Sequence, residues 1–212
     1  METKDQKFVI CLGREYGSGG HNIGKALSKM LGIEYYDKKL LDEAAKNSGI
    51  SQEYFARSDE KAPGSFSHTL SSGLFAAGGI FMYSNSLSSE NIFKYQSEAI
   101  REIASRTSCI IVGRCADYVL DGTENLVRLF VYAEIEERIN KVREKGYFPE
   151  EDILKNIKRI DRERRDYYRY YTGKSWENLE NYDLMINTTK LSYDDMVECV
   201  VDYLKMRGIL AK

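Results

Sequence analysis

The sequence has little proline, no long apolar run and no strong excess of charge. Only two of its 212 residues are proline, Pro63 and Pro149, which argues against a proline-rich linker protein. No apolar run approaches the roughly 20 residues of a membrane-spanning helix. The polar start METKDQK lacks the apolar segment of a secretion signal. The net charge of −2 gives no general attraction to nucleic acid or anionic membranes, so we expect neither as a partner.

Cysteine is also scarce and scattered. The chain has four, and they show no paired spacing typical of a metal site: Cys11, Cys109, Cys115 and Cys199. Cys11 and Cys109 lie in apolar runs, where a buried thiol is the usual case. The sequence therefore predicts no cysteine metal site, and it predicts a reducing cytoplasm as the location.

What the sequence does contain is an alternation of two hydrophobic patterns. Short apolar runs rich in β-forming residues occur at 8–12, 33–37, 109–114, 126–133 and 182–189. Helical periodicity occurs at 22–31, 38–49, 90–108, from 134, at 150–171 and at 192–208. Such alternation predicts a parallel sheet flanked by helices. We interpret residues 1–212 as a single globular α/β domain.

Residues 58–91 differ in composition, being rich in serine, glycine and aromatic residues. We interpret them as an inserted lobe that is mobile or faces a partner. A long ordered loop containing a helix is an equal alternative. The apolar stretch GLFAAGGIFMY, residues 73–83, is a candidate homodimer interface.

A glycine-dense stretch follows the first apolar run. Gly13, Gly17, Gly19 and Gly20 stand between that run and the helical pattern that begins near Asn22. Glycines let backbone N–H groups converge, and a helix N-terminus adds the positive end of its dipole. The stretch therefore predicts a loop that binds the phosphates of a nucleotide, built from Gly13, Arg14, Gly17, Ser18, Gly19, Gly20, His21 and Asn22.

This loop departs from the phosphate-loop pattern of glycine, four residues, and then Gly-Lys-Ser or Gly-Lys-Thr. Counted from Gly13, it is one residue longer, and Gly20 stands at the lysine position. His21 and Asn22 stand where the hydroxyl residue belongs. The loop therefore lacks its usual cation.

Another cation must replace that lysine if the loop holds phosphate. A literal glycine-lysine spacing exists in GGHNIGKA, but it places Lys25 inside the helix, about 140° around the axis from Gly20. Arg14 is the nearest cation in the loop. His21 is a weaker candidate, because an unperturbed histidine is mostly neutral at pH 7. We therefore expect Arg14 to take the role.

A second cluster of charge lies in the segment RIDRERRDYYR, residues 159–169. Arg162, Arg165 and Arg169 recur at spacings of three and four, which places them on one helix face. The isoleucines of this helix fall on the opposite face: Ile153, Ile157 and Ile160. Taken alone, such a face is more often a solvated surface laced by ion pairs. After a phosphate-type loop, the same arginines with Asp166 predict a clamp for phosphoryl groups.

Five features in this order resemble the cytidylate kinase-like family, relatives of the nucleoside monophosphate kinases. They are the glycine loop, YYD after the second strand, Gly-Arg after the third, the arginine-rich helix and the closing LMINTTKLSYDDMVECVVDYL. The resemblance is weakest over residues 58–91. It implies a P-loop NTPase-like three-layer sandwich of about five parallel strands, with an inserted lobe and an arginine-rich helical lid at residues 147–175. It also implies transfer of the ATP γ-phosphoryl group, with Mg²⁺, to a nucleoside monophosphate or similar small acceptor.

The resemblance assigns roles to three groups of residues. The donor phosphates would meet the backbone amides of Gly17, Ser18 and Gly19. The acceptor nucleotide would face Asp37 and Arg114. The lid pattern RxxRDxxR, which contacts the acceptor and the transferring phosphate, is matched by Arg162, Arg165, Asp166 and Arg169.

Each acceptor residue has a structural alternative. Asp37 could cap a following helix, and Arg114 could make a surface ion pair. Cys115 follows Arg114 where the family usually has an acidic residue.

Two other functions stay open at this stage. The turn GREYGSG and the pair Tyr170 and Lys174 resemble a short-chain dehydrogenase. A non-catalytic protein that binds a nucleotide without turnover is the other alternative.

Overall fold

The computed structural model describes residues 7–37 and 89–211. Its centre is a five-stranded sheet in the order β2-β3-β1-β4-β5, and every neighbouring pair is parallel. The strands are β1 (Val9–Arg14), β2 (Glu34–Tyr36), β3 (Cys109–Val112), β4 (Leu126–Tyr132) and β5 (Leu184–Asn187). The α/β class and the five parallel strands predicted from the alternating patterns are confirmed.

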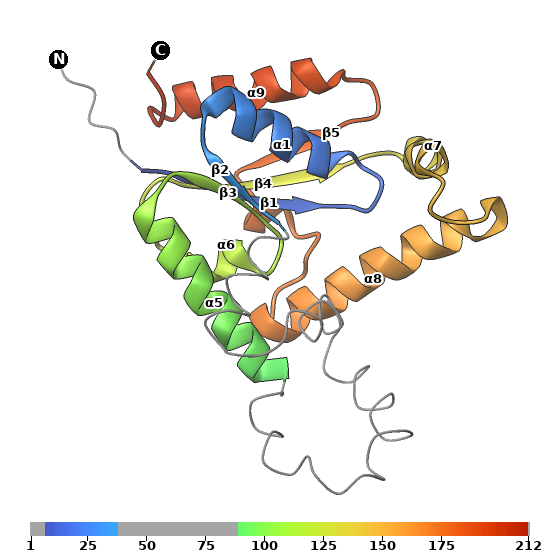
Figure 1. Ribbon diagram of the computed structural model, residues 1–212, viewed down its shortest axis with the longest axis horizontal. Helices are drawn as coiled ribbons and strands as arrows, with labels where there is room; N and C mark the ends of the chain where they lie inside the picture. Colours follow the sequence, from blue (N-terminus) through green and yellow to red (C-terminus); the bar gives the residue numbers. More distant parts are fainter. Residues whose placement is uncertain (1–6, 38–88, 212) are drawn as a thin grey trace, which may run out of the picture.

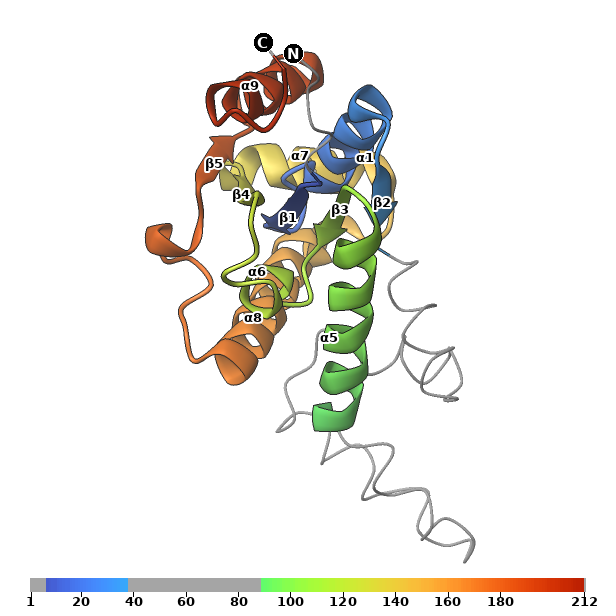
Figure 2. The same cartoon turned by 90° about the vertical axis from the view of Figure 1, so that its left-hand side faces the viewer.

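Helices cover both faces of this sheet (Figure 1). They are α1 (Gly20–Leu31), α5 (Ser89–Arg106), α6 (Ala116–Val119), α7 (Ile135–Lys145), α8 (Ile153–Thr172) and α9 (Tyr193–Met206). Two 3₁₀ turns precede α8 and β5: η1 (Glu150–Asp152) and η2 (Leu179–Asn181). Figures 1 and 2 place α1 and α9 on one side of the sheet and α5, α6 and α8 on the other.

Alternation along β1 explains the two cores. Ile10 and Leu12 are buried in a cluster with side chains of α1 and α9. Val9 and Cys11 are buried in a second cluster with side chains of α5 and α6. Because both faces of a central parallel strand are covered, its sequence is a continuous apolar run rather than an alternating one.

The helix predictions are mostly confirmed. α9 begins at a capping box in which Ser192 and Asp195 exchange side-chain to backbone hydrogen bonds. The short helix α6 was not predicted. Residues 38–49 and the interface stretch 73–83 lie outside the described residues, as does nearly all of the segment 58–91. Among the helices that the structure describes, none is both long enough and apolar enough to span a bilayer.

Candidate functional site

The glycine loop joins β1 directly to the N-terminus of α1. The strand continues through Arg14, two residues further than predicted, and Gly20 is the first residue of the helix. Gly17 and Gly19 have φ angles of +82° and +88°, a region that side chains disfavour. The first N–H groups of a helix lack the carbonyl partner one turn earlier, although the Asn22 N–H here donates to the Gly19 carbonyl at 2.9 Å. This is the geometry of an anion site.

Arg14 occupies the space where a side chain at position 20 would begin. A β-carbon on Gly20 would lie 2.7 Å from the Arg14 β-carbon, and a β-carbon on Gly113 would lie 2.6 Å from Arg14 Nη1. The Arg14 side chain therefore runs past the start of α1 toward the end of β3. Position 20, where the phosphate-loop pattern has lysine, has room only for glycine because the Arg14 side chain lies against it.

The end of β3 is conformationally strained. Gly113, Arg114 and Cys115 have φ angles of +74°, +59° and +54°, so three consecutive residues are left-handed. For the two residues with a β-carbon, this conformation costs roughly 1–2 kcal/mol each. Strain of this kind persists where the surrounding structure fixes it, and it concentrates at functional sites.

Arg114 is buried at this strained turn, being 7% exposed. Burial lowers its pKa to about 10, and the positive charges of Arg14 and Arg164 contribute in the same direction, while Asp37 opposes them. The guanidinium is still charged at neutral pH. A surface ion pair, the alternative considered for Arg114, does not fit this burial.

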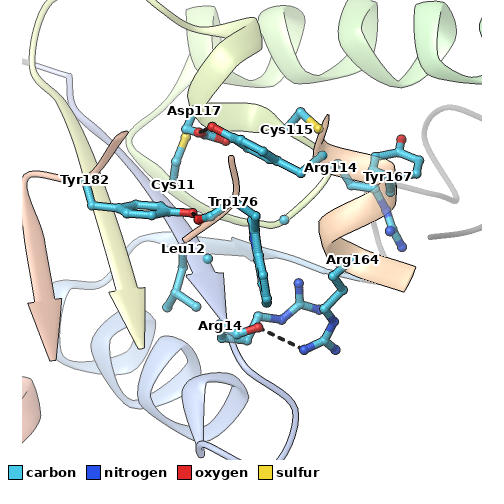
Figure 3. A pocket seen from close by; sticks show the side chains of 13 residues that line it. Cys11, Leu12, Arg14, Arg114, Cys115, Asp117, Arg164, Tyr167, Trp176 and Tyr182 are labelled. Atoms are coloured by element: carbon cyan, nitrogen blue, oxygen red, sulfur yellow. Dashed lines mark hydrogen bonds between the residues drawn. The ribbon is translucent and has the colours of Figure 1, made fainter. Parts of the chain in front are cut away.

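Arg14, Arg114 and Arg164 line one pocket at the carboxyl ends of β1 and β3, which we call the arginine pocket (Figure 3). Arg164 comes from α8, and its Nη1 donates to the Arg14 carbonyl at 2.9 Å. The other lining residues are Cys11, Leu12, Gly13, Gly113, Cys115, Asp117, Tyr167, Tyr168, Trp176 and Tyr182. Three like charges around one hollow favour a bound anion, and guanidinium groups suit phosphate oxygens.

The far wall of the arginine pocket is aromatic and carries one carboxyl group. Tyr168 Oη donates to Asp117 Oδ2 at 2.6 Å, and Tyr182 Oη donates to the Trp176 carbonyl at 2.6 Å. Burial raises the pKa of Asp117, and the Tyr168 hydrogen bond partly offsets that rise. Asp117 was not predicted, although it stands three residues after Arg114, in the first turn of α6.

A buried ion-pair network ties the glycine loop to α7 and α8. Arg138 of α7 pairs with Asp161 of α8 and, at 3.0 Å, with Glu15 of the loop. Asp161 Oδ1 accepts the Tyr16 backbone N–H at 2.7 Å, and Arg138 Nε donates to the Tyr16 carbonyl at 2.8 Å. The loop is therefore held in place by charged side chains from both helices.

Comparison with protein families identifies the group to which this site belongs, because the description "Cytidylate kinase-like family" matches residues 9–190. The chain belongs to the cytidylate kinase-like family. Comparison with curated protein sequences gave no significant match. The family match confirms the resemblance drawn from the order of the motifs.

Solved structures agree on the fold. An uncharacterized protein from Eubacterium ventriosum ATCC 27560 is 25% identical, with a TM-score of 0.70 over 94% of this chain and 99% of that one. Shikimate kinase from Acinetobacter baumannii, in complex with shikimate, is 14% identical with a TM-score of 0.52, covering 96% of each chain. Shikimate kinase from Bacteroides thetaiotaomicron is 13% identical with a TM-score of 0.53, covering 96% and 99%. These similarities show that the chain shares its fold with the two shikimate kinases, and the family supports a kinase-type phosphotransferase.

The structure places the three arginines that match the family lid away from the arginine pocket. Arg162 and Arg169 are exposed, and Arg165 pairs with Glu177 at 2.8 Å beside a separate groove between α7 and α8. The exposed Asp166 also does not line the arginine pocket. Their contacts with phosphate stay a prediction.

Asp161 of α8 contacts the loop at Tyr16, and Arg164 contacts the Arg14 carbonyl at the end of β1; neither contact was predicted. The signal was present, because Asp161, Arg164 and Tyr168 continue the stripe of Ile153 and Ile157 at spacings of three and four. Ile153 and Ile157 are buried as predicted and Ile160 is half-buried, whereas the burial of Asp161 was not predicted. The inner face of α8 is therefore apolar at one end and charged where it meets the loop.

Asp37 and His21 meet beside the first turn of α1. His21 Nδ1 lies 3.2 Å from Asp37 Oδ2 and 2.9 Å from Tyr35 Oη. Asn22 Nδ2 donates to Tyr193 Oη at 3.4 Å. Whether Asp37 also caps a helix concerns residues outside those described. The contact with His21 places the Asp37 carboxylate next to the glycine loop.

The dehydrogenase alternative gains no support from the site. Tyr170 is 50% exposed, and its hydroxyl donates to Glu90 at 3.1 Å. Lys174 is exposed, and neither residue lines the arginine pocket. The pair is therefore separate from the glycine loop that a nucleotide cofactor would use.

Proposed function

We propose that this protein transfers the γ-phosphoryl group of ATP to a nucleoside monophosphate or a similar small acceptor. The observation that carries the proposal is the position of Arg14, which fills the space over Gly20 where the loop lysine would stand. A phosphotransferase of this fold needs a positive charge at that point of the loop. Arg14 supplies it from the end of the preceding strand.

The donor phosphates would bind at the N-terminus of α1. Gly17 and Gly19 let the loop curve, and the first-turn amides and the helix dipole favour the negative charge. The guanidinium groups of Arg14 and Arg164 would meet the phosphoryl oxygens. Phosphoryl transfer depends mainly on positioning and on stabilisation of charge, and groups held by their neighbours supply both.

The acceptor would enter from the side of Arg114 and Asp37. Arg114 lines the arginine pocket, and Asp37 is close enough to influence its pKa. The aromatic wall formed by Tyr167, Tyr168 and Trp176 would exclude water from the transferring group, which strengthens electrostatic interactions. Arg162, Arg165, Asp166 and Arg169 would join the site only through a further movement of α8.

Mg²⁺ fits this arrangement as a companion of the nucleotide. Protein sites usually hold Mg²⁺ through substrate phosphates and one or two carboxylates. Among the residues that the structure describes, no cluster of three or more His, Cys, Asp or Glu side chains could hold an ion by itself. Asp37 is the candidate carboxylate, because it lies against the first turn of α1. The ion would neutralise charge on the β- and γ-phosphates.

Four free thiols are compatible with a cytoplasmic location.

A coupled assay of ADP release tests the proposal. Wild-type protein and the variant Arg14→Ala are each mixed with Mg-ATP and a panel of nucleoside monophosphates and small hydroxylated acceptors. We expect the wild-type protein to release ADP in the presence of one acceptor class, and the Arg14→Ala variant to lose this release. Binding of ATP without acceptor-dependent turnover would favour the non-catalytic alternative and overturn the proposal.

A further inference from the structure

The loop between β1 and α1 contains one residue more than the phosphate-loop pattern allows, and Tyr16 lies in the part that is lengthened. Both backbone polar groups of Tyr16 are engaged by side chains from other elements. Its N–H donates to Asp161 Oδ1 at 2.7 Å, and its carbonyl accepts from Arg138 Nε at 2.8 Å. These groups are therefore turned toward α7 and α8, and the Tyr16 amide is not available to a phosphate.

We propose that Asp161 is a positioning residue. It holds Tyr16 away from the phosphate-binding part of the glycine loop, residues 17–20, and thereby fixes that part around the donor phosphates. This inference rests on the proposed function, because the ligand is the nucleoside triphosphate named there. Asp161 does not touch that ligand. It acts through Tyr16 and through Arg138.

The network that Asp161 completes is buried. Asp161 is 5% exposed and Arg138 is 6% exposed. The second carboxylate that pairs with Arg138 belongs to Glu15. Glu15 Oε2 also accepts the backbone N–H of Ala133, just past the end of β4, at 3.1 Å. A buried ion pair holds its geometry well when its remaining polar atoms are satisfied. The loop is thus fixed to the sheet, to α7 and to α8 at once.

The same helix also fixes the residue that supplies the cation. Arg164, one turn after Asp161 on α8, donates to the Arg14 carbonyl at 2.9 Å. Asp161 and Arg164 lie 3.8 Å apart, between Oδ1 and Nη1. α8 therefore sets the backbone on both sides of Glu15. Without the Asp161 charge, a single amide oxygen would have to serve both the Tyr16 N–H and Arg138, so the hold on Tyr16 and the support of Arg14 would weaken.

The test uses Asp161→Asn in the full-length protein, with Glu163→Gln as the matched control. Asparagine keeps the shape, and Arg138 keeps Glu15, so the variant should still fold. Glu163 is on the same helix and pairs with the more exposed Arg159 at 2.8 Å. Three quantities are measured: the Kd for Mg-ATP by calorimetry, the hydrogen exchange of the peptide spanning residues 14–20, and the Tm.

We expect Asp161→Asn to raise the Kd for Mg-ATP about tenfold or more, the size expected for a lost charged hydrogen bond. Exchange in residues 14–20 should accelerate by a similar factor, because local opening becomes easier. Glu163→Gln should leave both quantities within about twofold of wild type. A purely structural Asp161 would lower the Tm and leave the Kd of the folded protein unchanged, and that result would overturn the inference.

Two further results keep the test decisive. If Asp161→Asn does not fold, Arg138→Lys replaces it, because lysine keeps the charge and loses the contact of Nε with the Tyr16 carbonyl. The same changes in Kd and exchange are expected. If wild type binds no nucleoside triphosphate, the proposed function fails, and the exchange of residues 14–20 alone decides the positioning role: unchanged exchange overturns it.

Discussion

The β-carbon of Arg14 crowds the backbone of Gly20. Any other residue at position 20 would place its own β-carbon 2.7 Å from that of Arg14. Real β-carbons do not approach this closely, so position 20 must be glycine as long as Arg14 keeps its place. The absent lysine and the arginine six residues before it are thus one structural feature. This relationship gives the first two predictions.

Arg14→Ala should weaken the binding of ATP, and Lys25→Ala should leave it nearly unchanged. Loss of one charged hydrogen bond to phosphate costs roughly 1.5–3 kcal/mol, or about 10- to 150-fold in Kd. Lys25 is exposed and points elsewhere on α1. Calorimetric titration of both variants measures the difference. Should Lys25→Ala prove the damaging change, GGHNIGKA is the phosphate loop after all.

Gly20→Lys should not improve the wild-type protein, although it completes the usual loop pattern. Its β-carbon would collide with Arg14 Cβ, so we expect weaker ATP binding and a lower Tm. The double variant Arg14→Gly/Gly20→Lys removes the collision, because glycine has no β-carbon, and it supplies the cation from the other residue. It should bind ATP more tightly than either single variant, a coupling that a double-mutant cycle measures. Additive losses would mean that the two positions do not exchange roles.

The sequence was sufficient for the fold because the fold depends on local pattern. Ile10 and Leu12 face one core, and Val9 and Cys11 face the other, so a short apolar run between polar segments already indicates a central parallel strand. The glycine loop was found for the same reason. The structure confirms that the loop leads from the first strand into the N-terminus of α1.

The sequence was not sufficient for the residues that α8 brings to the loop. Asp161 and Arg164 continue the isoleucine stripe, but they stand in a run of alternating charges, and charged residues usually lie at the surface. What buries Asp161 is Arg138, on another helix. The prediction therefore favoured Arg162, Arg165 and Arg169, which fit the family pattern but do not line the arginine pocket.

Arg165→Ala should lower turnover far more than it lowers the Tm. Arg165 is partly exposed and its ion pair with Glu177 is on the surface, so the pair contributes little to folding, about 0–1 kcal/mol. Arg164→Ala should lower both, because Arg164 also holds the Arg14 carbonyl. Steady-state kinetics and thermal unfolding of the two variants give the comparison. Equal small losses for Arg165→Ala would favour an ion pair without a role in transfer.

Asp117 gives a prediction for the pH dependence of stability. Burial raises the pKa of its carboxyl group in the folded protein, so the native state binds this proton more tightly than the unfolded chain does. The stabilisation from the protonated carboxyl is complete below the unfolded pKa and is lost as the pH rises through the folded pKa. At neutral pH the buried carboxylate therefore opposes folding.

Asp117→Asn should raise the free energy of unfolding at pH 7, and the gain should shrink toward zero below pH 4, where the wild-type carboxyl is also neutral. Asparagine can still accept the hydrogen bond that Tyr168 Oη donates to Asp117, so packing is largely kept.

Tyr168→Phe should instead lower the free energy of unfolding, because loss of that bond removes an interaction that lowers the Asp117 pKa. Its destabilisation should therefore be larger at pH 7 than at pH 4. Urea unfolding of the three proteins between pH 4 and pH 8 measures these differences. A gain for Asp117→Asn that stays the same at every pH would mean that ionisation of Asp117 is not its cause.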